Sequence, residues 1–159
     1  MTEDNRAVVL IVDDEEMVLT SLNSFLALET DYEVVTFTDP NAALERIGQE
    51  GVDLAISDYL MPEMDGITFL GKVRELEPEI PRILLTGYSD KENAIKAINE
   101  VGLFQYIEKP WDNDNLQIII RNGLEKQALL RVLQEKVAEM NKAYNDLQGI
   151  HQHILKAFA

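Results

Sequence analysis

The chain has 159 residues, no Cys, 27% charged residues and a net charge of −15. This length suits one compact domain with an appended segment, and the lack of Cys excludes disulfides and Cys-ligated metals. Residues 126–159 carry five Lys or Arg and three Asp or Glu, a net +2, which leaves −17 for residues 1–125. A domain that acidic repels phosphate backbones and anionic lipids, so we expect no direct binding of nucleic acid or membrane.

The first residues indicate where the protein resides. Residues 1–6 are polar, and we interpret them as a disordered tail. The apolar run that follows, Ala7 to Val12, is far shorter than the ~20 residues needed to cross a bilayer. The acidic start also lacks the positive flank of a signal peptide. We therefore predict a cytoplasmic protein.

Short apolar runs alternate with segments of helical spacing along the rest of the chain. The predicted strands are Ala7–Val12, Glu33–Phe37, Leu54–Asp58, Arg82–Thr86 and Gln105–Ile107. The predicted helices cover Met17–Leu28, residues 40–47, residues 66–76, residues 91–101 and a last segment beginning near Asp112. Asp39 and Asp90 are expected to cap two of these helices. Strictly alternating elements predict an α/β fold with a parallel sheet and helices on both faces.

The last predicted helix contains no Pro from Asn113 to Phe158 and changes pattern along its length. Its first part has a wide apolar face for docking on the sheet, whereas residues 126–159 show an a/d heptad pattern over about four heptads. The seam residues are Leu130, Leu133, Val137, Met140, Tyr144, Leu147, His151 and Ile154. Because one helix cannot bury so narrow a stripe alone, we predict a coiled coil in a homodimer. The alternative is a helix that folds back on its own domain.

Five polar residues follow the predicted strands: Asp13 and Asp14, Asp58, Thr86 and Lys109. The carboxyl ends of parallel strands share one edge of the sheet, so we expect these side chains to converge. Taken singly, each has an ordinary explanation as a turn residue, a helix cap, a loop residue or a strand former. Their occurrence together at matched strand ends favours a functional site.

The chemistry of this set indicates phosphoryl transfer. Three adjacent carboxylates cannot all stay ionised without a cation, and oxygen ligands with room for water suit Mg²⁺. A metal-neutralised carboxylate exposed at a strand end is a candidate nucleophile, which makes Asp58 a potential site of aspartyl phosphate formation. Lys109 can pair with one phosphoryl oxygen, and the Thr86 hydroxyl can donate to another.

Four motifs give the chain a resemblance to the receiver domain of two-component response regulators. They are Val12-Asp13-Asp14, the run from Ser57 to Gly66, Leu84-Leu85-Thr86-Gly87 and the run from Tyr106 to Pro110. The resemblance covers roughly residues 7–125. It implies a doubly wound, flavodoxin-like sheet of order 2-1-3-4-5. It also implies that Asp58 is phosphorylated by a sensor histidine kinase or a phosphotransfer protein.

The same resemblance assigns further roles. Asp13, Asp14, Asp58 and the main-chain carbonyl of Leu60 would hold Mg²⁺. Thr86 and Tyr106 would form a switch pair that alters the face made by the fourth helix, fifth strand and fifth helix. Pro110 would follow a cis peptide bond. We expect that face to relay the signal to the coiled coil.

Two positions depart from the polar residues most common in this family. Leu60 stands two residues after Asp58, and Tyr88 stands two residues after Thr86. Both flank the route by which water would attack the phosphoryl group. Apolar bulk there predicts slow self-dephosphorylation.

We considered other functions. We expect no enzyme activity beyond self-phosphorylation and self-dephosphorylation, and we interpret residues 126–159 as leading to an output domain that the sequence lacks. An aspartyl-type Mg²⁺-dependent phosphatase would need a second acid at the position of Leu60. A coiled-coil adaptor with an inert receiver, and phosphorylation of His151 or His153, are the remaining alternatives.

Overall fold

Residues 6–157 are described by the computed structural model, in which Tyr88 and residues 155–157 are placed by their main chain alone. Strands and helices alternate along this part of the chain as predicted. The elements are β1 (Val8–Val12), α1 (Glu16–Glu29), β2 (Glu33–Phe37), α2 (Pro40–Gln49), β3 (Leu54–Asp58), α3 (Gly66–Leu76), β4 (Arg82–Thr86), the 3₁₀ turn η2 (Tyr88–Asp90), α4 (Lys91–Glu100), β5 (Gln105–Glu108) and α5 (Asn113–Ala157). The tail predicted over residues 1–6 lies outside the described residues except for Arg6. The Arg6 guanidinium donates hydrogen bonds to the carbonyls of Asp31 and Tyr32.

The five strands form one parallel sheet in the order β2-β1-β3-β4-β5, which confirms the predicted flavodoxin-like fold. At one edge of the sheet, Val12 of β1 pairs with Ser57 of β3, and Thr86 of β4 pairs with Glu108 of β5. These pairs fall at or next to the last residue of each strand. The carboxyl ends of β1, β3, β4 and β5 therefore lie side by side.

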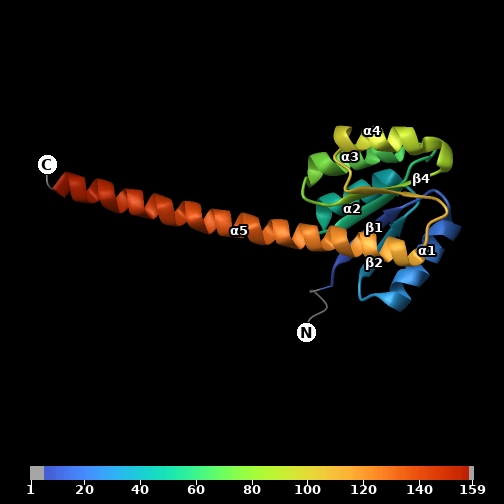
Figure 1. Cartoon of the computed structure of the whole chain (residues 1–159), viewed down its shortest axis with the longest axis horizontal. Coiled ribbons are helices and arrows are strands. Elements are labelled where there is room, and N and C mark those ends of the chain that lie inside the picture. Colours follow the sequence, from blue (N-terminus) through green and yellow to red (C-terminus); the bar gives the residue numbers. More distant parts are fainter. Residues whose placement is uncertain (1–5, 158–159) are drawn as a thin grey trace. The chain divides into compact units, whose positions relative to one another are not determined.

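Apolar side chains cover both faces of the sheet. Successive strand residues point to opposite faces, so β1 contributes Leu10 and Val12 to one cluster and Val9 and Ile11 to the other. The first cluster packs against α2, α3 and α4, and the second against α1 and the first turns of α5. Figure 1 shows α3 and α4 together on one side of the sheet and α1 on the other.

Of the two predicted helix caps, the structure confirms the one at Asp39. Asp39 Oδ1 accepts a hydrogen bond from the Asn41 amide at 3.0 Å, as expected of a capping residue. The predicted cap of α4 is wrong, because the Asp90 side chain makes no capping hydrogen bond. Asp90 ends the 3₁₀ turn with φ −102° and ψ 3°, away from the extended conformation typical of a capping residue.

A buried arginine joins two loops at the amino edge of the sheet, opposite the strand ends described above. Arg82 opens β4 and is 7% exposed. Its guanidinium donates to the carbonyls of Pro78 and Ile80 before the strand, at 3.0 and 2.9 Å, and to those of Val101 and Gly102 after α4, at 3.3 and 2.9 Å. The guanidinium therefore holds the end of α4 against the loop that follows α3.

The chain divides into two compact units, one ending at Gln127 and the other beginning at Ala128. In the first unit, α5 buries Leu116 and Ile120 against the sheet, as its predicted apolar face requires. The second unit is the remainder of the same helix, so the predicted long helix is confirmed. Its exposed large apolar residues include Leu133, Val137, Met140, Tyr144, Leu147 and Ile154. Their pairing with a second chain stays a prediction.

A helix that crosses a bilayer needs about 20 consecutive, mostly apolar residues. Within the described range, none of the helices combines the length and apolar character that such a span needs.

Candidate functional site

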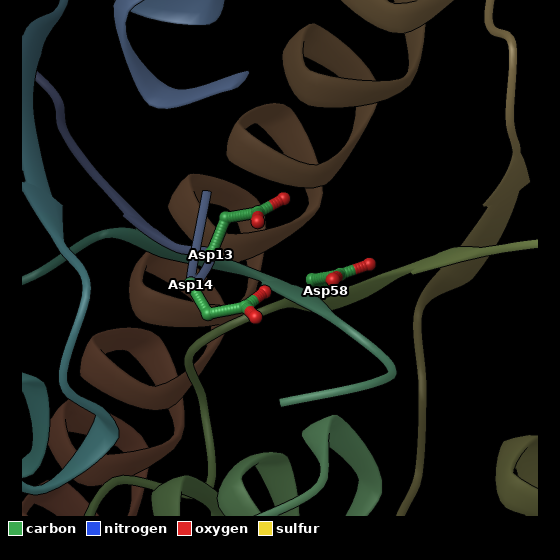
Figure 2. A group of neighbouring side chains, drawn as sticks. All are labelled: Asp13, Asp14 and Asp58. Carbon is green, nitrogen blue, oxygen red and sulfur yellow. The ribbon is translucent and has the colours of Figure 1, made fainter. Parts of the chain in front are cut away.

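Three carboxylates meet at the carboxyl edge of the sheet. Asp13 and Asp14 directly follow β1, and Asp58 is the last residue of its neighbour β3. Each offers an oxygen, and these oxygens all lie within 4.8 Å of one another (Figure 2). Asp13 is fully buried, Asp58 is 7% exposed and Asp14 is open to solvent. The predicted convergence therefore places one accessible carboxylate beside two that are shielded from water.

Lys109 supplies the positive charge of the site. It follows β5, and its Nζ lies 2.6 Å from Asp58 Oδ1 and 3.9 Å from Asp13 Oδ2. Its amide donates to the Thr86 carbonyl at 2.8 Å, and the Lys109–Pro110 peptide bond is cis, as expected. Burial lowers the pKa of Lys109, but the hydrogen bond and charge of Asp58, with the charge of Asp13, outweigh it and raise that pKa overall. Lys109 is thus held protonated against Asp58.

Asp13 carries the most perturbed carboxylate. Its Oδ1 accepts a hydrogen bond from the Glu15 amide at 2.9 Å, whereas its buried Oδ2 has no hydrogen-bond partner among the described residues. Burial is the main cause that raises its pKa to about 6, with a further contribution from the charge of Asp58. A buried oxygen left without a hydrogen bond, next to two more carboxylates, fits a hard divalent cation such as Mg²⁺.

The described contacts of the Thr86 and Tyr106 side chains are with β5 and with the apolar cluster on one face of the sheet. The Thr86 side chain is buried, and its Oγ1 donates to the Ile107 carbonyl at 3.5 Å, at the limit of hydrogen-bond length. Tyr106 is half-buried and packs against the cluster beneath α2, α3 and α4. Asp13, Asp14, Asp58 and Lys109 therefore lie together, as predicted, whereas the Thr86 hydroxyl makes its hydrogen bond to the main chain of β5.

The segment that follows Asp58 contains Leu60, which was predicted to slow dephosphorylation, and Gly66, which packs against Asp58. Leu60 is 63% exposed at its outer side. The side chain of Tyr88, the other residue predicted to tune dephosphorylation, lies outside the described part of the structure. Gly66 packs so tightly that a Cβ there would overlap the Asp58 carbonyl and meet Leu84 Cδ1 at 2.8 Å. From sequence, Gly66 is expected to begin a helix and to close the motif that starts at Ser57, but its tight contact with Asp58 is visible only in the folded chain.

Comparison with known proteins agrees with this geometry. Residues 9–121 match the model of the response regulator receiver domain family. The chain is 38% identical over 126 residues to the hydrogenase transcriptional regulatory protein HoxA of Cupriavidus necator, covering 79% of this chain and 26% of that protein. It is 32% identical to the response regulator protein TmoT of Ectopseudomonas mendocina, covering 96% of this chain and 69% of TmoT.

Solved structures give the same result. The signal receiver domain of an HD domain-containing protein from Pseudomonas fluorescens Pf-5 superimposes with a TM-score of 0.73 at 37% identity, covering 78% of this chain and 98% of that one. The chain spans about a quarter of the length of HoxA, so the match with that protein concerns one part of a longer molecule.

Proposed function

The chain belongs to the response regulator receiver domain family, and we propose that it is a switch in which Asp58 accepts a phosphoryl group from a phosphohistidine of a sensor kinase or phosphotransfer protein. The observation that carries this proposal is the Asp58 carboxylate at the end of β3, hydrogen-bonded to Lys109 at 2.6 Å and grouped with Asp13 and Asp14. A structural salt bridge would not need two further carboxylates beside it.

The metal ligands follow from the same group. Asp13, Asp14 and Asp58, with the main-chain carbonyl of Leu60, would hold Mg²⁺. Bound there, the cation neutralises the negative charge that the carboxylates and the phosphoryl oxygens bring together. The Oδ2 of Asp13 supports this assignment, because it is a buried acceptor for which the described residues supply no hydrogen-bond donor.

The transfer step uses the Asp58 carboxylate that Lys109 holds through Oδ1. In this step a carboxylate oxygen of Asp58 attacks phosphorus. As the new oxygen–phosphorus bond forms, the phosphorus–nitrogen bond to the donor imidazole breaks, and the imidazole leaves with that electron pair and takes up a proton. The Lys109 ammonium then lies within reach of a phosphoryl oxygen and stabilises its charge.

The response begins at Thr86 and Tyr106. Phosphorylation adds about −1.5 to −2 charges and three acceptor oxygens beside Thr86. The Thr86 hydroxyl would leave its long bond to Ile107 for a phosphoryl oxygen, and Tyr106 would turn into the space that Thr86 gives up. These movements would alter the face formed by α4, β5 and α5.

The proposed receiver of that change is a dimer formed through the second unit. The eight predicted seam residues recur at alternating spacings of three and four on a helix with its apolar side chains exposed. We infer that two copies pair along this seam and that phosphorylation changes their packing.

The first experiment is phosphorylation with a small phosphodonor, acetyl phosphate, in the presence of Mg²⁺, followed by intact mass measurement. We expect one added phosphoryl group, lost after treatment with base, because an acyl phosphate is labile there and a phosphohistidine is not. Asp58→Asn should abolish the addition, whereas Asp39→Asn, at a helix cap far from the site in sequence, should not. Base-stable phosphate, or labelling that persists in Asp58→Asn, would contradict the proposal.

A further inference from the structure

The second unit exposes more apolar surface than the predicted seam uses. Leu129 is 70% exposed and Ile150 is 58% exposed, although neither belongs to the seam. Both fall on a line of residues that lies beside the seam at every seventh position. Three parallel lines therefore run along this helix, and they share the same heptad period.

The three lines can be defined by their residues. The shared line is Leu133, Met140, Leu147 and Ile154. The first flank line is Leu130, Val137, Tyr144 and His151. The second flank line is Leu129, Lys136, Ala143 and Ile150. The shared line combines with either flank line to give alternating steps of three and four residues, so the sequence contains two overlapping heptad seams.

The charges of this segment favour a second copy of the same chain as the occupant of either seam. The charged residues of the opposite side are Arg131, Glu135, Glu139, Lys142 and Asp146. On the three lines, Lys136 alone is charged, and its Nζ lies 3.6 Å from Glu139 Oε2 of the same helix. Two copies can therefore meet along these lines without placing like charges in rows, and identical heptad repeats are complementary about a two-fold axis.

The residue types do not favour one seam decisively over the other. The first seam includes Tyr144 and His151, which bring polar groups to core positions. The second includes Lys136 and the small Ala143, which leave a charge and a gap. Each seam thus has two residues that a stable two-stranded coiled coil would avoid. Adjacent residues are about 100° apart around a helix, so exchanging the flank lines requires a rotation of about 50°.

We propose that the paired helices alternate between these two seams and that phosphorylation shifts the balance by rotating α5. This inference rests on the proposed function, because it requires both the dimer and the receiver switch. The helix that carries the seams is the one that starts four residues after Lys109 and buries Leu116 and Ile120 in the receiver core. A change at the site thus acts on the first turns of the same continuous helix.

Disulfide cross-linking can test the proposal because the chain has no Cys of its own. Single variants Met140→Cys, Val137→Cys and Ala143→Cys report on the shared, first flank and second flank lines. Each is oxidised with and without beryllium fluoride, a phosphoryl mimic, in the presence of Mg²⁺. We expect Met140→Cys to cross-link in both states. The ratio of Val137→Cys to Ala143→Cys cross-linking should change by about threefold or more, and Asp58→Asn should remove that change.

Two further variants separate the seams from general damage to the helix. Ile150→Glu places a charge on the second flank line alone, and His153→Glu places one on the exposed opposite side. We expect Ile150→Glu to suppress cross-linking through Ala143→Cys and to leave that through Val137→Cys. His153→Glu should change neither.

The possible failures are distinguishable. Cross-linking of the first flank line alone in both states would overturn the two-seam proposal and leave the dimer intact. A dimer by light scattering that fails to cross-link at Met140→Cys would overturn it as well, since the shared line would not be at the interface. A monomer in both states would overturn the proposed dimer, while phosphorylation of Asp58 is measured separately by mass.

Discussion

Two buried charges lie at opposite edges of one sheet and have opposite surroundings. Arg82, at the amino edge, donates to four main-chain carbonyls. Asp13, at the carboxyl edge, has one oxygen bonded to an amide and one buried oxygen without a hydrogen bond. Buried polar groups are normally satisfied. The amino edge therefore uses its charge to hold the fold together, whereas the carboxyl edge leaves a buried carboxylate oxygen without a hydrogen bond, as the proposed metal site requires.

The largest expected effect comes from removing the satisfied charge. Arg82→Met leaves four carbonyls without their donor and should lower the free energy of unfolding by about 3–5 kcal/mol. Chemical denaturation followed by circular dichroism measures this. Arg121→Met, at an exposed position of α5, should cost less than about 0.5 kcal/mol. The folded fraction of Arg82→Met should still be phosphorylated on Asp58. Equal stability of the two variants would show that the Arg82 contacts contribute little.

The second prediction concerns the Asp13 charge, whose removal should stabilise the fold, whereas removal of the Arg82 charge should destabilise it. The pKa of Asp13 is about 6 in the folded protein and 3.8 in a model peptide. The folded state therefore binds more protons at Asp13 between these values. Without metal, the contribution of Asp13 to stability falls as pH rises from 4 to 6 and stays low above 6. The cost of charging Asp13 reaches up to about 3 kcal/mol. Asp13→Asn should recover part of it at pH 8 and little at pH 4.

Metal binding sharpens the same prediction. Mg²⁺ should stabilise the natural chain at pH 8 and have a much smaller effect on Asp13→Asn. Below pH 6 the apparent Mg²⁺ affinity should fall up to about tenfold per pH unit, because protons compete for Asp13. Thermal unfolding at several Mg²⁺ concentrations and pH values measures both effects. If Asp13→Asn were less stable than the natural chain at pH 8 without Mg²⁺, the role given to Asp13 would be contradicted.

The sequence predicted which residues meet at the carboxyl edge, but not how every side chain there is oriented. Parallel strands place their ends at one edge, so Asp13, Asp14, Asp58 and Lys109 could be brought together from strand positions alone. The direction of the Thr86 hydroxyl could not be predicted in this way, because it depends on a side-chain rotamer and on the local acceptor at Ile107. Strand position fixes where a side chain starts, and packing fixes where it points.

Two further features show the same limit. The apolar pattern of α4 includes Ile95 and Ile98, yet Ala94 and Ala97 are buried and the two isoleucines are 47% and 38% exposed. A short amphipathic pattern does not decide which of two adjacent apolar lines faces the core. Arg82 was visible as a charged residue at the start of an apolar strand. Two of its acceptors, the carbonyls of Pro78 and Ile80, are close to it in sequence. The other two, at Val101 and Gly102, lie about 20 residues away and reach it only in the folded chain.

The smallest predicted effect is at the outer side of the carboxyl edge, where Leu60 is exposed beside the proposed phosphoryl group. Apolar bulk there should hinder the water that attacks phosphorus. Leu60→Asn should therefore raise the dephosphorylation rate constant by about threefold to tenfold, roughly 0.7–1.4 kcal/mol of barrier. Loss of the phosphorylated mass with time in Mg²⁺ measures this.

Leu28→Asn is the matched control for Leu60→Asn, because Leu28 is an 84% exposed leucine near the end of α1. It should leave the rate constant unchanged and should match Leu60→Asn in stability, since both replace an exposed leucine by the same residue. Equal dephosphorylation rates for the two variants would show that Leu60 does not shield the phosphoryl group. A faster rate for Leu60→Asn alone would show that the apolar side chain at this edge prolongs the phosphorylated state.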